Sequence, residues 1–335
     1  MISLKSNKIK ALAAGLMLTL ALGALGCGGD KKEAGAKAEK VNVGIVQLVE
    51  HEALDAANKG FVDGLASKGY KEGQNIAFDR QNAQADQSNL QNIAHRFVNN
   101  KVDLICAIAT PAAQTVANVT SDIPIVATAV TDYKTAKLVK DDAKPGTNVT
   151  GTTDMNPVAE QLDLLLKLVP NAKTIGTIYC SSEVNSQLQV ELLKKAAAAK
   201  GITVKEATVS TVNDIQQAAR SLAGDVQAVY VPTDNVLASA IPTLISVTEE
   251  AKLPVICAEG GMVRAGGLAT LGVDYYKLGF QTGVMAADIL SGKSKPADMA
   301  IQAQKEFKPT INLKEAAKIG LKVPEELLKG AEVIK

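Results

Sequence analysis

Tryptophan is absent from this sequence, and aromatic residues make up only 3% of it. Histidine is nearly as scarce, with only His51 and His95 present, and there are four cysteines. These residues form no cluster with the spacing of a metal site. Neither a G-x-G-x-x-G nor a P-loop sequence occurs, so no phosphate-binding loop is indicated. We therefore expect no metal and no cofactor.

The chain also lacks an excess of charge of either sign. It has 36 Lys and Arg against 35 Asp and Glu, a formal net charge of +1. Nucleic-acid binding is typical of proteins with a strongly basic face, which this composition does not indicate. We expect no nucleic acid among the partners of this protein.

The one strongly apolar stretch lies at the N-terminus. Lys5, Lys8 and Lys10 precede an uncharged run over residues 11–26, which ends at Cys27. The run is shorter than the roughly 18 residues that a membrane-spanning helix needs, and small residues crowd its end. Residues 1–26 therefore indicate a lipoprotein signal peptide. An uncleaved anchor helix is the alternative.

The residues around the cleavage point resemble a bacterial lipobox, in which Cys27 is lipidated and becomes the new N-terminus. The segment that follows, GGDKKEAGAKAEK, has no large apolar side chain with which to offset the entropy of ordering. Residues 27–40 are predicted to be a flexible tether. The folded part is therefore expected outside the cytoplasm, held to the bacterial membrane by a lipid.

Three cysteines remain after Cys27. Cys106, Cys180 and Cys257 each lie inside or at the end of an apolar run. Free cysteine is among the most buried residue types, and an odd number cannot pair completely. We expect three buried free thiols.

From residue 41 onward, apolar runs alternate with helical patterns. Strands are predicted at 41–49, 74–80, 102–109, 123–130, 173–180, 202–209, 226–231, 253–258 and 267–273. Helices are predicted at 54–68, 89–99, 157–168, 184–200, 214–222 and 236–251. This alternation, with nearly continuous Val and Ile in the strands, is typical of parallel sheets covered on both faces.

A chain of this length exceeds one comfortable core, so we expect an α/β fold with two doubly wound parallel-sheet lobes. The break falls near residues 148–157. The first lobe is predicted from residues 41–154 and 275–300, and the second from 155–274 and 301–335.

Ligands of parallel sheets bind beyond the carboxyl ends of the strands. In the first half, candidate residues at these ends are Gln47, Glu50, Thr110, Ala112, Ala113, Thr128 and Asp132. The sequence Thr110-Pro111-Ala112-Ala113 indicates a helix start with open backbone N–H groups, which attracts anions.

In the second half, the candidates are Ser182, Asn185, Ser186, Asp234 and Asn235, with Asp154 and Asp274 expected where the chain crosses between lobes. Each also has an ordinary role, since Ser and Asp are good helix N-caps and Glu183 suits the positive end of a helix dipole. Capping alone does not require so many polar groups at one junction. His51 is a weaker candidate.

Several motifs together resemble the substrate-binding lipoproteins of ABC importers of the tryptophan/tyrosine-binding type. They are HEALDAANKGFVDGLASKGYKEGQNI (51–76), DLICAIATPAAQ (103–114), VTDYK (130–134), NVTGTTD (148–154), YCSSEVNS (179–186), YVPTDN (230–235) and VDYYKLG (273–279). The resemblance implies a type I periplasmic-binding-protein fold with three crossovers, a monomer that captures an amino acid between its lobes, and an ABC permease as partner. It implies no enzymatic activity.

The resemblance also implies roles for the candidate residues. Thr110 and the N–H groups of Ala112 and Ala113, helped by Thr128, would take the ligand carboxylate. Asp234 with Asn235 would pair with the ammonium, and Ser182, Asn185 and Ser186 would hold the same head group. Which helix N-terminus holds the carboxylate stays open. The mouth or hinge side would be lined by Gln47, Glu50, Asp132, Asp154 and Asp274.

One residue departs from the family pattern. A proline usually follows the VTD aspartate, whereas this chain has Tyr133, which leaves the identity of the ligand side chain open. A binder of branched-chain amino acids, nucleosides or sugars, a ligand-sensing domain for a receptor, and a hydrolase are the competing hypotheses.

Overall fold

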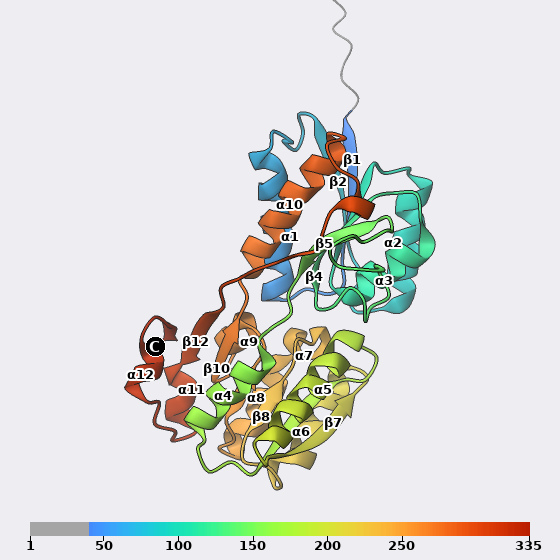
Figure 1. Cartoon of the computed structure of the whole chain (residues 1–335). Coiled ribbons are helices and arrows are strands. Elements are labelled where there is room, and N and C mark those ends of the chain that lie inside the picture. Colours follow the sequence, from blue (N-terminus) through green and yellow to red (C-terminus); the bar gives the residue numbers. More distant parts are fainter. Residues whose placement is uncertain (1–39) are drawn as a thin grey trace, which may run out of the picture. The chain divides into compact units, whose positions relative to one another are not determined.

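The computed structural model describes residues 40–335, which contain two mainly parallel sheets, each covered by helices on both faces (Figure 1). The predicted signal peptide, Cys27 and all of the predicted tether except Lys40 lie outside the described residues. We call the elements packed around the first sheet the first lobe, and those around the second sheet the second lobe.

The first sheet has six strands in the order β11-β5-β4-β3-β1-β2. Its strands are β1 (Val41–Gln47), β2 (Ile76–Asn82), β3 (Leu104–Ile108), β4 (Ile125–Val130), β5 (Val149–Thr153) and β11 (Gln302–Ala303). All pairings are parallel, and the register between β4 and β5 shifts between Ala127 and Val130. Its helices are α1 (Glu52–Ser67), α2 (Gln87–Asn99), α3 (Thr110–Val119) and α10 (Tyr275–Leu290).

The second sheet has seven strands in the order β13-β12-β10-β9-β8-β6-β7. Its strands are β6 (Thr174–Cys180), β7 (Thr203–Val209), β8 (Val229–Val231), β9 (Val255–Cys257), β10 (Ala269–Gly272), β12 (Lys308–Asn312) and β13 (Glu332–Ile334). Its helices are α4 (Val158–Leu168), α5 (Val184–Ala199), α6 (Ile215–Ala223), α7 (Asn235–Ser239), α8 (Ile241–Glu250), α9 (Gly260–Arg264), α11 (Leu313–Lys318) and α12 (Glu325–Leu328). Short 3₁₀ turns lie at Val212–Asp214 and Pro296–Asp298.

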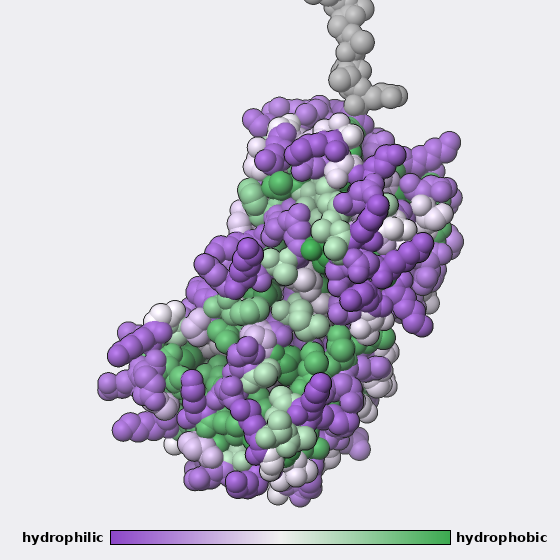
Figure 2. Space-filling view, in the orientation of Figure 1, coloured by the Kyte–Doolittle hydropathy of each residue, from purple (hydrophilic) through white to green (hydrophobic). Residues whose placement is uncertain are grey.

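Each lobe is held by its own buried apolar core. Phe61, Phe97 and Ile105 belong to the core of the first lobe. The second sheet has a core on each face, with Leu244 in one and Leu165 in the other. On the face drawn in Figure 2, polar residues cover much of the first lobe, and hydrophobic residues show between polar ones over the second. Among residues 40–335, no helix combines the length and hydropathy needed to cross a bilayer.

The predicted α/β fold with two sheets and three crossings is confirmed. The chain passes from the first lobe to the second between β5 and α4, returns between β10 and α10, and crosses again between β11 and β12. These crossings place the carboxyl ends of both sets of parallel strands at the junction between the lobes.

Four details differ from the predictions. Strand β5 and helix α10 were not predicted as elements. Strand β12 pairs antiparallel with β10, so the second sheet is not wholly parallel. The helix predicted at 236–251 is two helices, because Ala240 has non-helical backbone angles and Pro242 lies in the first turn of the next helix, where proline is favoured. Finally, Gln302–Ala303 pairs with β5, so the first sheet extends beyond the boundary predicted at residue 300.

Candidate functional site

Polar loops from both lobes meet around a small cavity between the two sheets. Its lining residues are His51, Leu54, Ala129, Asp154, Thr233, Asp234, Asn235, Ala238, Glu259, Met262 and Tyr275. We call this the interlobe cavity. Its volume is about 10 Å³, room for about one water, so an amino acid requires the lobes or side chains to move.

A buried carboxylate joins two helix starts of the second lobe. Glu183 accepts hydrogen bonds from Asn185 Nδ2 (2.9 Å) and from the backbone N–H (3.0 Å) and Nδ2 (2.5 Å) of Asn235. On the first lobe, His51 Nε2 lies 3.3 Å from Asn235 Oδ1. Asn235 therefore connects the lobes, because its amide nitrogen is committed to Glu183 and its oxygen faces His51.

Burial sets the protonation of this network. It raises the pKa of Glu183 to about 8, with repulsion from Asp234 as the second cause. It also raises the pKa of Asp234 and lowers that of His51. All three shifts favour the neutral form of the group.

Asp234, the residue predicted to pair with the ligand ammonium, is already bonded within the second lobe. Its Oδ2 accepts from the Cys180 N–H (2.6 Å) and the Ser186 hydroxyl (2.7 Å), and its Oδ1 accepts from the Leu237 N–H (2.9 Å). Ser186 and Asn185 also donate to the Thr233 carbonyl. This part of the predicted site is a framework that fixes the starts of α5 and α7.

Asp154 has fewer protein donors than Asp234, the other predicted acid of the interlobe cavity. Its two oxygens accept one hydroxyl each, from Thr131 at 2.9 Å and from Tyr275 at 2.8 Å. The residue is fully buried, and burial raises the pKa of its carboxyl. A carboxylate can accept about four hydrogen bonds, so Asp154 retains capacity for a donor on a ligand.

The start of α3 carries the features predicted for an anion site. The hydroxyl of Thr110 is buried and has no hydrogen-bond partner among the described residues. Ala109 just before it has φ +90°, a conformation that costs free energy for a residue with a side chain. The Ala112 N–H lies in the first turn, where helical partners do not exist. The Ala113 N–H, predicted to be open, instead donates to the Ala109 carbonyl at 3.0 Å.

Several predicted residues lie elsewhere or have other partners. Thr128 shares a buried hydroxyl chain with Thr152 and Thr282, which leads towards α10. Gln47 is bonded to Asp55 and Asn58 of α1. Glu50 is exposed.

Asp132 caps a turn by accepting from the Thr135 N–H, and Asp274 caps α10 at the hinge. Ser182 is exposed and lines a separate cavity at the mouth with Pro111. Tyr133, the departure from the family pattern, is buried and donates to the carbonyls of Ala127 and Thr152. Its ring therefore belongs to the core of the first lobe.

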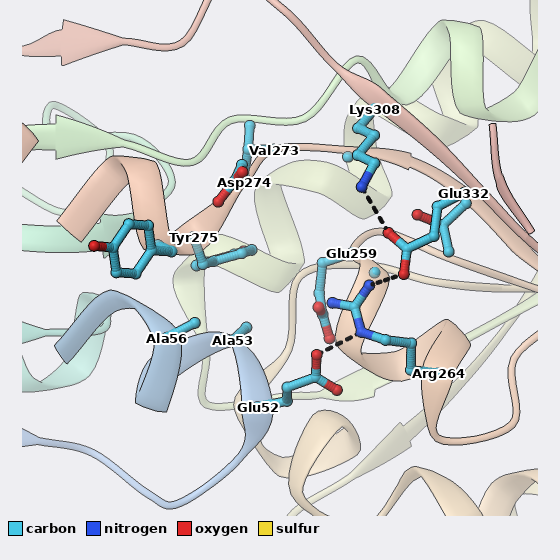
Figure 3. Close-up of a pocket in the computed structure, with 14 residues that line it drawn as sticks. Glu52, Ala53, Ala56, Glu259, Arg264, Val273, Asp274, Tyr275, Lys308 and Glu332 are labelled. Carbon is cyan, nitrogen blue, oxygen red and sulfur yellow. Dashed lines mark hydrogen bonds and ion pairs between the residues drawn. The ribbon is translucent and has the colours of Figure 1, made fainter. Parts of the chain in front are cut away.

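Two residues of the site were not predicted. Tyr275 follows the predicted Asp274, and Glu259 follows the apolar run that forms β9. Both line the interlobe cavity and also a second one of about 250 Å³ on the hinge side, which we call the hinge-side cavity (Figure 3). There, Arg264 joins Glu52 of the first lobe to Glu332 of the second.

The remaining side-chain chemistry is sparse. In the part of the chain that the structure describes, no group of three or more His, Cys, Asp or Glu is arranged to hold a metal ion. Cys106, Cys180 and Cys257 are buried and unpaired, as predicted. The site therefore offers hydrogen bonds and buried carboxylates for a small polar ligand.

Residues 42–335 match the family described as ABC transporter substrate binding protein. The chain belongs to this family. It is the substrate-binding component of an ABC transporter, a class of protein that works outside the cytoplasm and delivers a small molecule to a membrane permease.

Three similar proteins place the chain more closely within the family. It is 48% identical over 265 residues to the tyrosine-binding protein of Clostridioides difficile, covering 79% of this chain and 76% of that one. A Streptococcus pneumoniae protein in complex with L-Trp is 41% identical, with a TM-score of 0.85 over 89% of this chain and 100% of that one. A ligand-free, open substrate-binding protein with adhesive properties from Clostridium difficile is 45% identical, with a TM-score of 0.68 over 88% and 99%.

The two lobes of this chain are arranged more as in the tryptophan complex than as in the open, ligand-free protein. At similar identity, the chain superposes better on the tryptophan complex than on the open, ligand-free protein. The contacts of His51 with Asn235 and of Glu52 with Arg264 across the junction agree with a closed arrangement.

Proposed function

We propose that this substrate-binding protein captures an aromatic amino acid, tryptophan, tyrosine or phenylalanine, between its lobes. The observation that carries the proposal is the similarity to the tryptophan-bound protein along nearly the whole chain. The identity of 48% to a tyrosine-binding protein supports it independently. A sugar ligand is disfavoured because the chain has no tryptophan and only five phenylalanines for stacking.

The head group of the amino acid finds both charges it needs at the junction. Asp154 takes the ammonium, because both of its oxygens have free acceptor capacity and its two partners are side-chain hydroxyls that can reorient. The Thr110 hydroxyl and the Ala112 N–H take the carboxylate at the positive end of α3. A buried zwitterion is stable only when both charges are paired and hydrogen-bonded, so the acid and the helix start act together.

Ligand binding shifts the equilibrium between an open and a closed form of the protein. The ligand bridges both lobes and therefore stabilises the closed form, which presents one surface to the permease. The protein acts as a monomer and performs no chemistry on its ligand. A hydrolase would instead need an activated nucleophile, and Ser182 has Cys180 Sγ as its side-chain partner, not a base.

Calorimetry on refolded, ligand-free protein tests the proposal. Tryptophan, tyrosine and phenylalanine are titrated beside leucine, valine, glucose and adenosine. Saturable binding of the aromatic amino acids, at least about tenfold tighter than binding of leucine, supports the proposal. Tighter binding of leucine, glucose or adenosine would overturn it.

We further propose that the mature protein is held to the membrane by a lipid on Cys27. The basic start, the short apolar run and the small residues before this cysteine support that anchor. A tether with no large apolar side chain leaves the lobes free to reach the permease.

A further inference from the structure

Glu259 is another buried carboxylate at the junction. It follows β9, is 3% exposed and caps α9, where its Oε2 accepts from the Gly261 N–H and its Oε1 from the Met262 N–H. Because each carboxylate oxygen can accept about two hydrogen bonds, both oxygens of Glu259 retain one open position. The carboxylate also lines both the interlobe and the hinge-side cavities.

Capping does not explain this choice of residue. Ser, Thr, Asp and Asn are the preferred N-caps, and a buried carboxylate costs free energy unless it is well paired. Arg264 attracts Glu259 electrostatically, but it donates its hydrogen bonds to Glu52 and Glu332 (Figure 3). Burial consequently raises the pKa of Glu259 to about 7.

Gly261 leaves the space that the Glu259 carboxylate occupies. A Cβ at Gly261 would lie 2.9 Å from Glu259 Oε2 and 3.2 Å from the Cβ of Glu52 on the first lobe. Glycine at this position therefore allows Glu259 to fold back onto its own helix while α1 of the other lobe approaches.

Apolar side chains lie beside Glu259 in the interlobe cavity, where Leu54, Ala238 and Met262 form part of the wall. The hinge-side cavity adds Ala53, Ala56 and Val273, together with the charged side chains of Glu52, Arg264, Asp274, Lys308 and Glu332. Glu259 and Tyr275 line both cavities, so the carboxylate lies where the two cavities adjoin. Pockets of this kind bind through apolar walls and gain specificity from a few placed polar groups.

An amino acid has one ammonium, and Asp154 is assigned to it, so the second acid faces a different part of the ligand. Beyond the head group, tryptophan has an indole N–H and tyrosine a phenol O–H, whereas phenylalanine has no donor. We propose that Glu259 is the specificity-determining acceptor for this ring donor, so that the site selects tryptophan and tyrosine over phenylalanine. The inference rests on the proposed function.

Tyrosine and phenylalanine differ by one hydroxyl, and calorimetric titration with both measures the contribution of Glu259. Wild-type protein should bind tyrosine at least tenfold more tightly than phenylalanine. Glu259→Gln replaces the carboxylate by an amide oxygen, which is a weaker hydrogen-bond acceptor. Glu259→Asp shortens the side chain and moves the carboxylate away from the tyrosine ring, while aspartate remains a favoured helix cap. Both variants should lower the tyrosine-to-phenylalanine affinity ratio by about tenfold, with phenylalanine affinity changed less than about threefold.

Glu315→Gln is the matched control, because Glu315 is another buried carboxylate of the second lobe and lines neither cavity. It should leave the ratio unchanged. An equal loss for both ligands in Glu259→Gln and Glu259→Asp, or an unchanged ratio in both, would overturn the assignment of Glu259 while the proposed function stands. A wild-type protein that binds neither of these two amino acids nor tryptophan would overturn the proposed function and this inference with it.

Discussion

At the level of single residues, the two buried acids Asp154 and Asp234 differ in how many hydrogen bonds they accept from the protein. Asp234 accepts three hydrogen bonds from its own lobe, whereas each oxygen of Asp154 has a single hydroxyl partner. Asp154 therefore has more acceptor capacity left for the proposed ligand than Asp234.

Replacement of Asp154 by asparagine should weaken amino-acid binding by more than about tenfold, because a charge-assisted hydrogen bond to the ammonium is lost. The Thr131 and Tyr275 hydroxyls can reorient towards the amide, so the fold should persist. Calorimetry at pH 7 measures the effect, with the exposed Asp122→Asn as the control. An affinity equal to that of wild type would remove Asp154 from the site.

Glu183 should make the stability of the protein depend on pH. Its pKa of about 8 in the folded state exceeds its ordinary value of 4.5, so between these pH values the folded state holds a proton that the unfolded state has lost. The free energy of unfolding should therefore fall as pH rises from about 4.5 to 8.

In Glu183→Gln the free energy of unfolding should decrease less steeply between pH 4.5 and about 8. A change in stability that is the same at every pH does not affect this slope. Urea unfolding at several pH values measures the slope, and the exposed Glu160→Gln serves as the control. A slope identical to wild type would mean that Glu183 does not titrate in this window.

At the scale of elements, α1 and α10 meet through glycines. A Cβ at Gly279 would lie 1.9 Å from the Ala57 carbonyl oxygen, and one at Gly60 would lie 2.1 Å from the Tyr276 carbonyl oxygen. The two helix backbones are therefore in direct contact, and α10 is fixed against the first lobe immediately after the hinge crossing.

Gly279→Ala should lower the free energy of unfolding by about 1–3 kcal/mol or more, because the added methyl group must push the helices apart. Thermal unfolding measures the loss. The matched control is Gly224→Ala, since a Cβ there has no neighbour within 4 Å. Equal melting temperatures for the two variants would show that the contact between the helices is loose.

The elements that sequence patterns missed share a physical cause. Helix α10 packs against both α1 and strands β4 and β5, so its apolar and small residues do not form the one-sided stripe that predicts a helix. Strand β5 contains Gly151 at φ +153°, held against the Ala127 carbonyl, and has no long apolar run. Long strands such as β1 and β6 were predictable because their runs are continuous.

The candidate site, like the fold, could be predicted only in part from the sequence. Of the residues predicted from the ends of the strands, Asp154, Asp234 and Asn235 line the interlobe cavity. The number of donors that each acid already has could not be predicted, because it depends on contacts between distant segments, such as Cys180 with Asp234. Glu259 was missed because one glutamate after an apolar run is indistinguishable in sequence from a surface residue.

For the whole molecule, the proposed lipid anchor predicts where the protein is found in the cell. Cys27→Ser should prevent lipidation and release a soluble protein that binds its amino acid normally. Fractionation of cells followed by calorimetry on the released protein tests both parts. Retention of the variant in the membrane fraction would indicate an uncleaved apolar helix instead of a lipid.

Capture of an aromatic amino acid is the central claim, and the absence of tryptophan from the chain allows a direct test. With excitation at the red edge of indole absorption, emission comes from added tryptophan alone, because the protein contributes only tyrosine and phenylalanine. The measurement is a titration of tryptophan with refolded, ligand-free protein, followed by competition with tyrosine. The account predicts a saturable blue shift, as the indole enters a dry pocket, and its reversal by tyrosine. An emission spectrum that stays unchanged in the presence of folded protein would contradict the account.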